Sequence, residues 1–551
     1  MTDDTLYRMN GPIRTLDPVQ TTTSSGTRVV SQMYETLFEY DYAADGSVTT
    51  APHLVDEQVE STGTTRVYEL RDDVTFSNGE SLTAPDVVYT LERVAASPSS
   101  VRSWLLLDVA GVAHETDDGE YVPGSLDVTA RDDRTVVIQL AEPFHGLEGV
   151  LADVRFSIVP EGQVDDVPGV DGAVSQETFA REPVGTGPFE LEAFDPDHEW
   201  SPTAEQAQHW VPPTDDPDEE LVLRAREAYR EPCSLDAIHY RVADIEQRHE
   251  LAHAGKSEEF YVRRDYVQPE ALTVDHTDEY GRRYGTYGPM PESGLTADYL
   301  GVPYPRTHLL VFDTERVPAA VRRAVAYAVD QETLATGPRH GRVEPAAFLT
   351  PPGLFPGGRD GYERERAASY PYDAEETLLA EARESVAELG HDSTDPYPLT
   401  IEGEPYREET CEWLAEELTA ANVDAEFVAS EFDELRDRRS EGVVDVSIIT
   451  FDMDYDAPDG FLRAVVPGED VLGTNWSGTA AADRAVAAWD RLQATRGHEA
   501  TAARSEAVLD VEAAIHEDLP VLPLYHFVGE RFSQQWVSFP DFGPESRNRQ
   551  R

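Results

Sequence analysis

Carboxylates and aromatic rings are most concentrated in the segment Phe451-Asp-Met-Asp-Tyr-Asp-Ala-Pro-Asp459. Clustered carboxylates suit hard cations such as Ca²⁺. An EF-hand loop counted from Asp452 needs glycine at position 457 and glutamate at position 463, where this chain has Ala457 and Arg463. The segment therefore does not predict a calcium site, and we expect neither a bound metal nor a cofactor.

A second chemistry for the same segment is recognition of a positively charged organic group. A buried ligand ammonium has to be paired, because an unpaired buried charge costs several kcal/mol. Asp454 follows a predicted strand and would supply the carboxylate, with Phe451 as an aromatic wall and Tyr455 as a wall that carries a hydroxyl. The alternative is that these acids belong to a solvated loop of an already acidic protein.

The string His249-Glu250-Leu-Ala-His253 offers a competing, enzymatic chemistry. Histidines four residues apart share one face of a helix, and the intervening glutamate would serve as the general base of a zinc peptidase. The longer form of this motif is absent, because Gly255 falls one position early and no third histidine follows at the required spacing. We expect a binding protein without enzymatic activity, and a zinc metallopeptidase is the alternative.

Alternating strands and helices surround these residues and predict an α/β fold. The spacing predicts a strand over 66–70, a turn at Asn78-Gly79 and a helix that begins after Thr83, with Asp86 in its first turn. Further predicted strands cover 399–402, 425–428, 444–451 and 519–525, and further predicted helices cover 29–38, 245–254, 321–330, 409–421 and 504–518. Residues 197–220 and 268–303 are predicted to be loops.

Several segments of this chain occur in the order that one protein family shows. They are Leu16-Asp-Pro18, residues 33–41, Ala51-Pro-His-Leu54, Thr65 to Arg93, Val184-Gly-Thr-Gly-Pro-Phe-Glu-Leu191, residues 321–330 and the closing strand Leu519 to Tyr525. Together they resemble the extracytoplasmic solute-binding proteins of the peptide/nickel class, solute-binding family 5, from about residue 6 to about residue 530. The Gly-x-Gly pair in the fifth segment lacks the helix and third glycine of a phosphate loop, and we interpret it as backbone crowding.

The resemblance implies a two-lobed fold of the periplasmic-binding-protein type, in which hinge closure traps a ligand in the cleft between the lobes. It places lobe I in residues 1–50, 175–245 and 475–551, an extra domain in residues 51–174 and lobe II in residues 246–474. The implied function is that of the substrate-binding component of an ABC importer. A free-standing cytoplasmic solute sensor is a further alternative.

The same resemblance assigns roles to individual residues and partners. It implies that Asp454 pairs with the α-ammonium of a bound peptide or of a similar cationic small solute. Asn475 and Trp476 lie in a segment similar to the family's return between lobes, and would add backbone-amide and stacking contacts. Ala457 departs from the family, where an acidic residue is frequent at this position. The implied partners are ABC permease subunits at the membrane.

The charge of the chain limits the settings in which it could stay folded. The formal net charge is -63 over 551 residues, and Lys256 is the only lysine among 44 basic residues. Repulsion of this size destabilises a compact state unless concentrated salt screens it, so the composition predicts a halophilic protein. Nucleic acid is not an expected partner, because binding it requires basic contacts to phosphates. A length of 551 residues predicts about two to four domains in what we expect to be a monomer.

Cysteines and the N-terminus bear on the compartment. Cys233 and Cys411 lie far apart without metal-ligand spacing, and free thiols are expected, with a disulfide as the alternative. The resemblance implies the extracellular face of the cell membrane. Met1 to Arg8, however, contain no basic region, apolar core, twin arginine or lipid-attachment cysteine, and no apolar run is long enough to span a membrane. A shortened or misassigned start, or a cytoplasmic location, is therefore the alternative.

Overall fold

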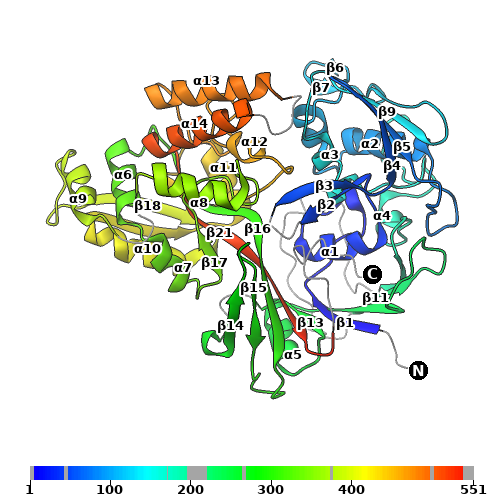
Figure 1. Cartoon of the computed structure of the whole chain (residues 1–551), viewed down its shortest axis with the longest axis horizontal. Coiled ribbons are helices and arrows are strands. Elements are labelled where there is room, and N and C mark those ends of the chain that lie inside the picture. Colours follow the sequence, from blue (N-terminus) through cyan, green and yellow to red (C-terminus); the bar gives the residue numbers. More distant parts are fainter. Residues whose placement is uncertain are drawn as a thin grey trace. The chain divides into compact units, whose positions relative to one another are not determined.

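The computed structural model describes residues 5–42, 47–170, 172–194, 220–262, 268–372, 377–496 and 502–537 (Figure 1). The chain packs into two compact units. Unit 1 comprises Met1–Ala44, Val48–Val302 and Glu530–Arg551, and unit 2 comprises Asp45–Ser47 and Pro303–Gly529. Most of the predicted loop 197–220 lies outside the described residues. The α/β prediction is confirmed.

Unit 1 is built on a mixed sheet with the strand order β10-β11-β12-β1-β13-β21. Strand β1 is parallel to both β12 and β13, whereas β10, β11 and β12 pair antiparallel. The core beneath this sheet includes Leu6, Val29, Phe179, Phe189 and Tyr240. Apart from the second sheet described below, the elements of unit 1 from the N-terminus to β13 are β1 (Thr5–Asn10), η1 (Pro18–Gln20), α1 (Ser24–Met33), β2 (Phe38–Tyr42), β3 (Val48–Pro52), α3 (Leu147–Val150), η3 (Val154–Phe156), α4 (Gln176–Phe179), β10 (Phe189–Phe194), β11 (Glu220–Ala225), β12 (Ala237–Val242), α5 (Ile245–His253) and β13 (Glu259–Phe260).

Two glycines let the chain return close to α1, as the Gly-x-Gly pair predicted. A Cβ on Gly185 would lie 2.3 Å from the Met33 carbonyl oxygen, and a Cβ on Gly187 would lie 2.5 Å from the Gln32 carbonyl oxygen. Real Cβ atoms do not approach backbone oxygen this closely, so only glycine fits. The interpretation of backbone crowding is confirmed.

A second sheet of unit 1 has the order β4-β5-β9-β8 and packs against helix α2. Its strands are β4 (Val55–Thr62), β5 (Thr65–Leu70), β8 (Val128–Ala130) and β9 (Thr135–Gln139), with the small hairpin β6 (Thr116–Asp117) and β7 (Glu120–Tyr121) and the π-helical turn η2 (Leu105–Val109) nearby in sequence. Helix α2 spans Ala84–Ala96, with Thr83 as its N-cap. The predicted strand 66–70 and the predicted helix start are confirmed, and Gly79 adopts the positive φ of 90° that its turn requires.

The prediction that residues 268–303 form a loop is wrong, because these residues form strands. Strands β14 (Leu272–Thr277) and β15 (Arg283–Tyr287) make a hairpin that pairs with the first half of β16 (Ala297–Phe312), and η5 (Pro269–Ala271) precedes it. Strand β14 has no buried residue, so it lacks the alternation of apolar and polar residues that marks a half-buried strand. This strand is defined by backbone hydrogen bonds to β15, which do not require particular side chains and therefore cannot be read from the amino-acid sequence.

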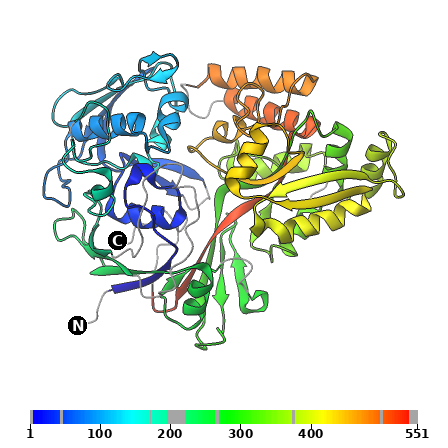
Figure 2. The same cartoon turned by 180° about the vertical axis from the view of Figure 1, so that it is seen from behind.

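Unit 2 contains the strand order β21-β16-β20-β18-β19. Strand β18 is parallel to β19 and to β20, and β16 is antiparallel to β20. Helices line the sheet, and Figure 2 shows α10 (yellow) alongside these strands. The elements are α6 (Ala319–Ala328), α7 (Gln331–Thr336), β17 (Val343–Pro345), α8 (Gly358–Ser369), α9 (Leu379–Ala387), β18 (Tyr397–Gly403), η6 (Pro405–Arg407), α10 (Glu408–Ala420), β19 (Val423–Ala429), α11 (Phe432–Ser440), β20 (Val446–Asp452), α12 (Asp459–Leu462), α13 (Ala480–Ala494), α14 (Ala502–Asp518) and β21 (Val521–Gln534).

Strands β16 and β21 each run from one unit into the other. The unit borders lie between Val302 and Pro303 and between Gly529 and Glu530, which differs from the predicted lobe borders at 246 and 475. Residues 246–302 belong to unit 1 because Ala252, Tyr287 and Tyr299 share a core with Phe532. Residues 475–529 belong to unit 2, since Leu519 and Tyr525 pack in the core that contains Leu310.

Candidate functional site

The carboxyl ends of β18, β19 and β20 lie at one edge of the unit 2 sheet, because these strands run parallel. Ligands of open α/β sheets bind beyond such an edge. A hydrogen bond of 2.9 Å from the Ser430 N–H, just after β19, to the Gly403 carbonyl, at the end of β18, joins two of these strand ends. Tyr406 and Phe432, which follow β18 and β19, are 57% and 59% exposed, so aromatic surface is available there.

Asp454 lies just beyond this edge, between the end of β20 and the start of α12. Its side chain is 13% exposed, and its carboxylate oxygen Oδ2 is 3.9 Å from Nη1 of Arg463. A carboxylate that is mostly removed from water can pair with a ligand ammonium. The sequence-based assignment of Asp454 stays a prediction, and its position is compatible with the assignment.

The two predicted aromatic walls differ in accessibility. Phe451 is partly exposed and makes an edge-to-face contact with Phe461, with 5.6 Å between ring centroids. Tyr455 is only 2% exposed, and burial, followed by the Asp459 carboxylate, raises the pKa of its hydroxyl. Phe451 therefore has surface to offer a ligand, whereas a contact with Tyr455 stays a prediction that requires movement of its neighbours.

The last acid of this segment has a structural partner. Asp459 is fully buried, and its Oδ1 lies 3.1 Å from Nη2 of Arg504, which joins α12 to α14. A buried ion pair of this kind cannot lose one partner cheaply. Part of the acidic pattern around Asp454 therefore stabilises unit 2 and does not contribute to ligand recognition.

Asn475 and Trp476 are held within unit 2 by their own side chains. The Asn475 amide donates to Oδ2 of Asp313 at 3.0 Å, and its backbone φ of 53° lies in the left-handed region that asparagine tolerates. The Trp476 ring is 2% exposed, and its indole N–H donates to Oδ2 of Asp518 at 2.8 Å. Both residues shape the return segment, and their predicted contacts with a ligand stay predictions.

Sequence reasoning missed a buried cationic cluster at the same edge of the sheet. Arg407, 3% exposed, donates to Oγ1 of Thr450 at 2.7 Å, to the Tyr406 hydroxyl at 2.8 Å and to Nδ1 of His308 at 3.1 Å. The only carboxylate on this guanidinium among the described residues is Glu404 of the same turn, at 3.4 Å. Most of the contacts of this charge are therefore with neutral groups.

A second guanidinium joins this cluster. Arg339, 9% exposed, lies over the Tyr525 ring at 5.4 Å, and His308 stacks on the same ring at 4.4 Å. The Nε atoms of Arg339 and Arg407 have no hydrogen-bond partner among the described residues. Buried cationic groups with unused donors favour an anion. Only the position of Arg407 directly after a predicted strand could have indicated this cluster, since Arg339 and His308 come from distant segments.

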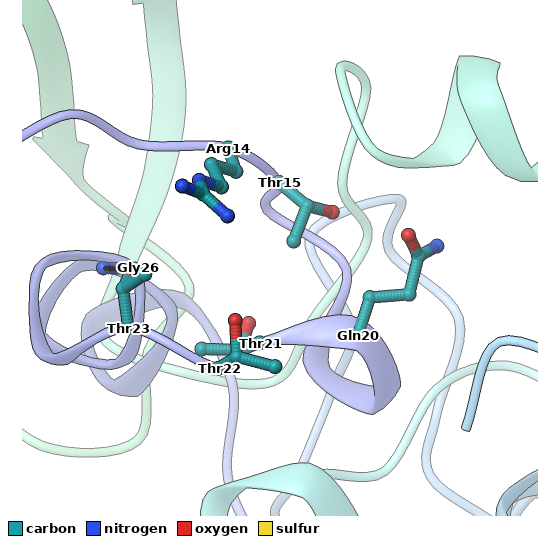
Figure 3. A pocket seen from close by; sticks show the side chains of 7 residues that line it. All are labelled: Arg14, Thr15, Gln20, Thr21, Thr22, Thr23 and Gly26. Carbon is teal, nitrogen blue, oxygen red and sulfur yellow. Dashed lines mark hydrogen bonds between the residues drawn. The ribbon is translucent and has the colours of Figure 1, made fainter. Parts of the chain in front are cut away.

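Unit 1 holds a small polar pocket at the start of α1 (Figure 3). Its walls are Arg14, Thr15, Gln20, Thr21, Thr22, Thr23 and Gly26. The pocket has a volume of about 10 Å³, enough for one water-sized polar group. Thr23 caps the helix by accepting from the Gly26 N–H at 3.1 Å, and burial lowers the pKa of Arg14. Hydroxyls, an amide and a guanidinium together suit a polar or anionic group.

The His-Glu-x-x-His string lies on α5 as predicted, but its histidines have protein partners. The rings of His249 and His253 are 4.0 Å apart between centroids, and His253 is buried against the Tyr287 hydroxyl at 3.1 Å and Glu292 at 3.4 Å. Burial lowers the pKa of both imidazoles. Within the described ranges no group of three His, Cys, Asp or Glu residues is placed to hold a metal ion.

Comparison with known proteins decides between the binding and the enzymatic interpretations. Residues 49–471 match the family described as bacterial extracellular solute-binding proteins, family 5 Middle. The chain belongs to this family. It is therefore a solute-binding protein and not an enzyme, and its family is extracellular.

Individual relatives agree with this family assignment. The dipeptide-binding protein DppE of Bacillus subtilis is 22% identical over 469 residues, which cover 84% of this chain and 76% of DppE. The murein tripeptide-binding protein MppA of Escherichia coli superposes with a TM-score of 0.70 at 18% identity, over 100% of this chain and 98% of MppA. The ABC transporter-associated periplasmic binding protein DppA of Helicobacter pylori, solved with the peptide STSA, gives a TM-score of 0.66 at 17% identity, over 98% of this chain and 96% of DppA. At these identities the solved structures establish the two-lobed fold.

Two smaller findings concern the cysteines and the membrane. Cys233 and Cys411 are free, as expected, and burial raises the pKa of the Cys411 thiol to about 12. Such a thiol stays protonated at neutral pH and is a poor nucleophile. None of the helices in the described part of the chain has the length and apolar character needed to cross a bilayer.

Proposed function

We propose that this chain is the substrate-binding component of an ABC importer and that its ligands are short peptides or similar cationic small solutes. The observation that carries the proposal is the pairing of opposite charges at one edge of the unit 2 sheet. Asp454 supplies a mostly buried carboxylate, and Arg407 supplies a mostly buried guanidinium with unused hydrogen-bonding capacity. A peptide is a zwitterion, and these two groups match its ammonium and its carboxylate.

The named ligands of relatives support this choice of ligand class. DppE is named for dipeptides and MppA for a murein tripeptide, and DppA of Helicobacter pylori was solved with STSA. Peptides share a backbone with charged ends and differ in their side chains. A site that pairs both ends can therefore bind many sequences, and Phe451, Tyr406 and Phe432 would contact variable side chains.

The wider biological setting is part of the same proposal. We infer that the ligand-bound protein delivers its solute to a permease, and that it works as a monomer at the outer face of the cell membrane. The family's extracellular character and the ABC transporter association of a relative support this setting. Asn475 and Trp476 would then hold the return segment in shape near the ligand.

The experiment tests charge pairing at both ends of the ligand. Purified protein in molar KCl is screened by thermal shift against di- to pentapeptides, and the best ligand is compared with its N-acetylated form and its C-terminal amide by calorimetry. Loss of a hydrogen bond to a charged group costs about 1.5–3 kcal/mol, which is roughly 10- to 150-fold in affinity. We expect Asp454→Asn to weaken the free peptide by that factor and to leave the acetylated peptide unaffected.

Matched variants separate recognition from a general loss of charge. Asp456→Asn removes the same charge two residues away, at a half-buried position, and should leave affinity within about twofold if Asp454 alone pairs with the ammonium. Arg407→Gln, which removes the positive charge, should abolish the preference for the free carboxyl over the amide. If Asp454→Asn and Asp456→Asn weaken the free peptide equally, the ammonium role of Asp454 is wrong. If no peptide stabilises the parent protein, peptides are not the ligand class.

A further inference from the structure

A buried three-residue ion cluster joins the two segments of unit 1 that carry the clearest family signature. Arg93 is completely buried near the end of α2, and its guanidinium holds Asp17 at 2.9 and 2.5 Å and Asp166 at 2.8 Å. Burial lowers the pKa of Arg93, but the two carboxylates offset this effect and leave the pKa above its usual value. Two of the family-like segments are therefore joined by an ion pair. Asp17 belongs to Leu16-Asp-Pro18, and Arg93 is the last residue of the segment Thr65 to Arg93.

Asp17 uses the same carboxylate to shape the turn that follows it. Its Oδ1 accepts from the Val19 N–H at 3.3 Å, and its Oδ2 accepts from the Gln20 side-chain amide at 2.9 Å. Its backbone carbonyl accepts from the Thr21 hydroxyl at 3.1 Å. The orientation of the Asp17 carboxylate therefore sets the path of the chain from residue 17 to residue 21.

Three more hydrogen bonds hold this turn, and all come from residues 101–180. The Val101 N–H donates to the Val19 carbonyl at 3.1 Å, and the Leu16 N–H donates to the Ala180 carbonyl at 3.3 Å. Arg155 donates through Nε to the Thr21 carbonyl at 2.8 Å. Local hydrogen bonds centred on Asp17 shape the turn, and these three contacts attach it to segments far away in sequence.

The turn forms a wall of the polar pocket at the start of α1. Thr15, Gln20 and Thr21 line this pocket, and Figure 3 shows Thr21 and Thr22 on the side of the pocket opposite Arg14. Gln20 both lines the pocket and donates to Asp17, which connects the pocket wall to the ion cluster through one side chain. A shift of the turn would therefore change the position of the pocket's amide and hydroxyl groups.

We infer that Asp17, oriented by Arg93, is a positioning residue, which holds the turn 17–21 in the shape that lets the pocket bind a polar group of the ligand. The residues from α2 to Ala180 thus serve as a scaffold for ligand recognition, although none of them lines the pocket. The inference rests on the proposed function in one respect, since it takes the pocket as part of the solute site. Its structural half, the control of the turn by Asp17, can be tested without any ligand.

The two carboxylates on Arg93 provide a matched pair of variants. Asp17→Asn and Asp166→Asn each remove one buried charge from the same guanidinium, but only Asp17 belongs to the turn. We expect both variants to lower the unfolding temperature. Hydrogen exchange measured by mass spectrometry on peptides covering residues 15–23 should accelerate about tenfold or more in Asp17→Asn and stay at the parent rate in Asp166→Asn. Equal exchange in the two variants would overturn the inference.

A milder variant covers the case in which Asp17→Asn does not fold. Arg155→Lys removes the hydrogen bond to the Thr21 carbonyl from the other side of the turn and leaves the ion cluster intact. Exchange should then rise within residues 15–23 and remain unchanged in α2. If Arg155→Lys exchanges like the parent protein, the turn does not depend on these distant contacts.

Peptide affinity completes the test with the best ligand from the library described above. Asp17→Asn should bind it at least about tenfold more weakly, whereas Asp166→Asn should bind it like the parent protein. Faster exchange with unchanged affinity would show that the turn is held as described and that the pocket is not part of the solute site. If the parent protein binds no peptide, the proposed function fails, and the exchange data still decide whether Asp17 controls the turn.

Discussion

His526 is neutral in the folded protein because each of its ring nitrogens has a defined hydrogen-bond role. Thr307 donates its hydroxyl to the Leu349 carbonyl, so its oxygen accepts from Nδ1–H of His526 at 3.0 Å. Tyr362 accepts from the Ala347 N–H and donates to Nε2 of His526 at 3.0 Å. Burial lowers the pKa of His526 to about 3 and that of His516 to about 4. Protonation of either ring would place a charge in the core of unit 2.

These histidines predict a loss of stability in mild acid. Below the unfolded-state pKa of about 6.5, the unfolded chain binds a proton that the folded chain refuses until the pH approaches the lowered values. Stability should therefore fall with pH from about 6.5 downward, by up to about 1.4 kcal/mol per pH unit for each histidine. Chemical unfolding at neutral pH and at about pH 5 measures this loss.

A comparison of variants separates the contribution of His526 to the pH dependence of stability from that of the many carboxylates that also titrate. His526→Gln keeps a side chain that can hydrogen-bond to Thr307 and Tyr362 but cannot ionise. Below about pH 6.5 the stability of this variant should fall less steeply with pH than that of the parent protein, and the difference in slope should equal the contribution of one histidine. His340→Gln, at an exposed position, should follow the parent curve. Parallel curves for all three proteins would contradict the prediction.

Individual site residues could be predicted where their immediate neighbours in the sequence indicated their role. Asp454 could be singled out from its aromatic and acidic neighbours, and the structure places it beyond a parallel-strand edge. The burial of Trp476 could not be predicted, because Asp518, its partner, comes from the end of a distant helix. Arg407, Arg339 and His308 escaped prediction for the same reason, since they come from distant segments that meet only in the folded unit.

Helix α2 shows how a local signal and a distant contact combine in one element. Oδ2 of Asp86 accepts from both the Thr83 N–H and the Thr83 hydroxyl at 2.7 Å, which fixes the start of the helix. Oδ1 of Asp86 accepts from the Glu161 N–H at 2.8 Å. The first two bonds were predictable from the spacing of Thr83 and Asp86. The third was not, and it attaches the helix start to a segment 75 residues away.

Asp86→Asn should destabilise the protein although it keeps the shape of the side chain. An amide presents one acceptor and one donor, so one of the backbone N–H groups would face another donor. The expected loss is about 1.5–3 kcal/mol in the free energy of unfolding, measured by denaturant titration. Asp127→Asn removes the same charge at an exposed position of the same sheet region and should change stability by less than about 0.5 kcal/mol. An equal loss in both variants would mean that charge, and not the hydrogen bonds of Asp86, stabilises the fold.

Helices and strands could be predicted where burial of one face gave the apolar residues a regular spacing. They could not be predicted where only backbone hydrogen bonding to a neighbouring strand defines them. Helices α10 and α14 and strand β18 carry buried apolar residues at regular spacing, and their predicted positions agree within a few residues. Strand β14 has no such spacing and was predicted as a loop. At the next level, the unit borders fall inside the long strands β16 and β21, where the composition does not change. Such borders depend on which core each half of a strand joins.

The whole molecule carries a net charge of -63, and this charge makes its stability depend on salt. The Debye length falls from about 10 Å at 0.1 M salt to about 3 Å at 1 M. Repulsion between carboxylates several ångströms apart is therefore strong in dilute buffer and almost absent in molar salt. Salt should stabilise the folded state, because folding brings these charges closer together than they are in the unfolded chain.

Thermal unfolding in KCl and in the zwitterion glycine betaine separates screening from other effects of concentrated solutes. KCl screens charge, whereas betaine is excluded from protein surfaces and leaves charge repulsion in place. We expect the unfolding temperature to rise by about 10 °C between 0.1 M and 2 M KCl, which at 2–4 °C per kcal/mol corresponds to roughly 3–5 kcal/mol. Betaine at the same concentrations should give less than half of that rise. If betaine stabilises the protein as much as KCl does, surface exclusion accounts for the effect, and the acidic composition is not an adaptation to salt.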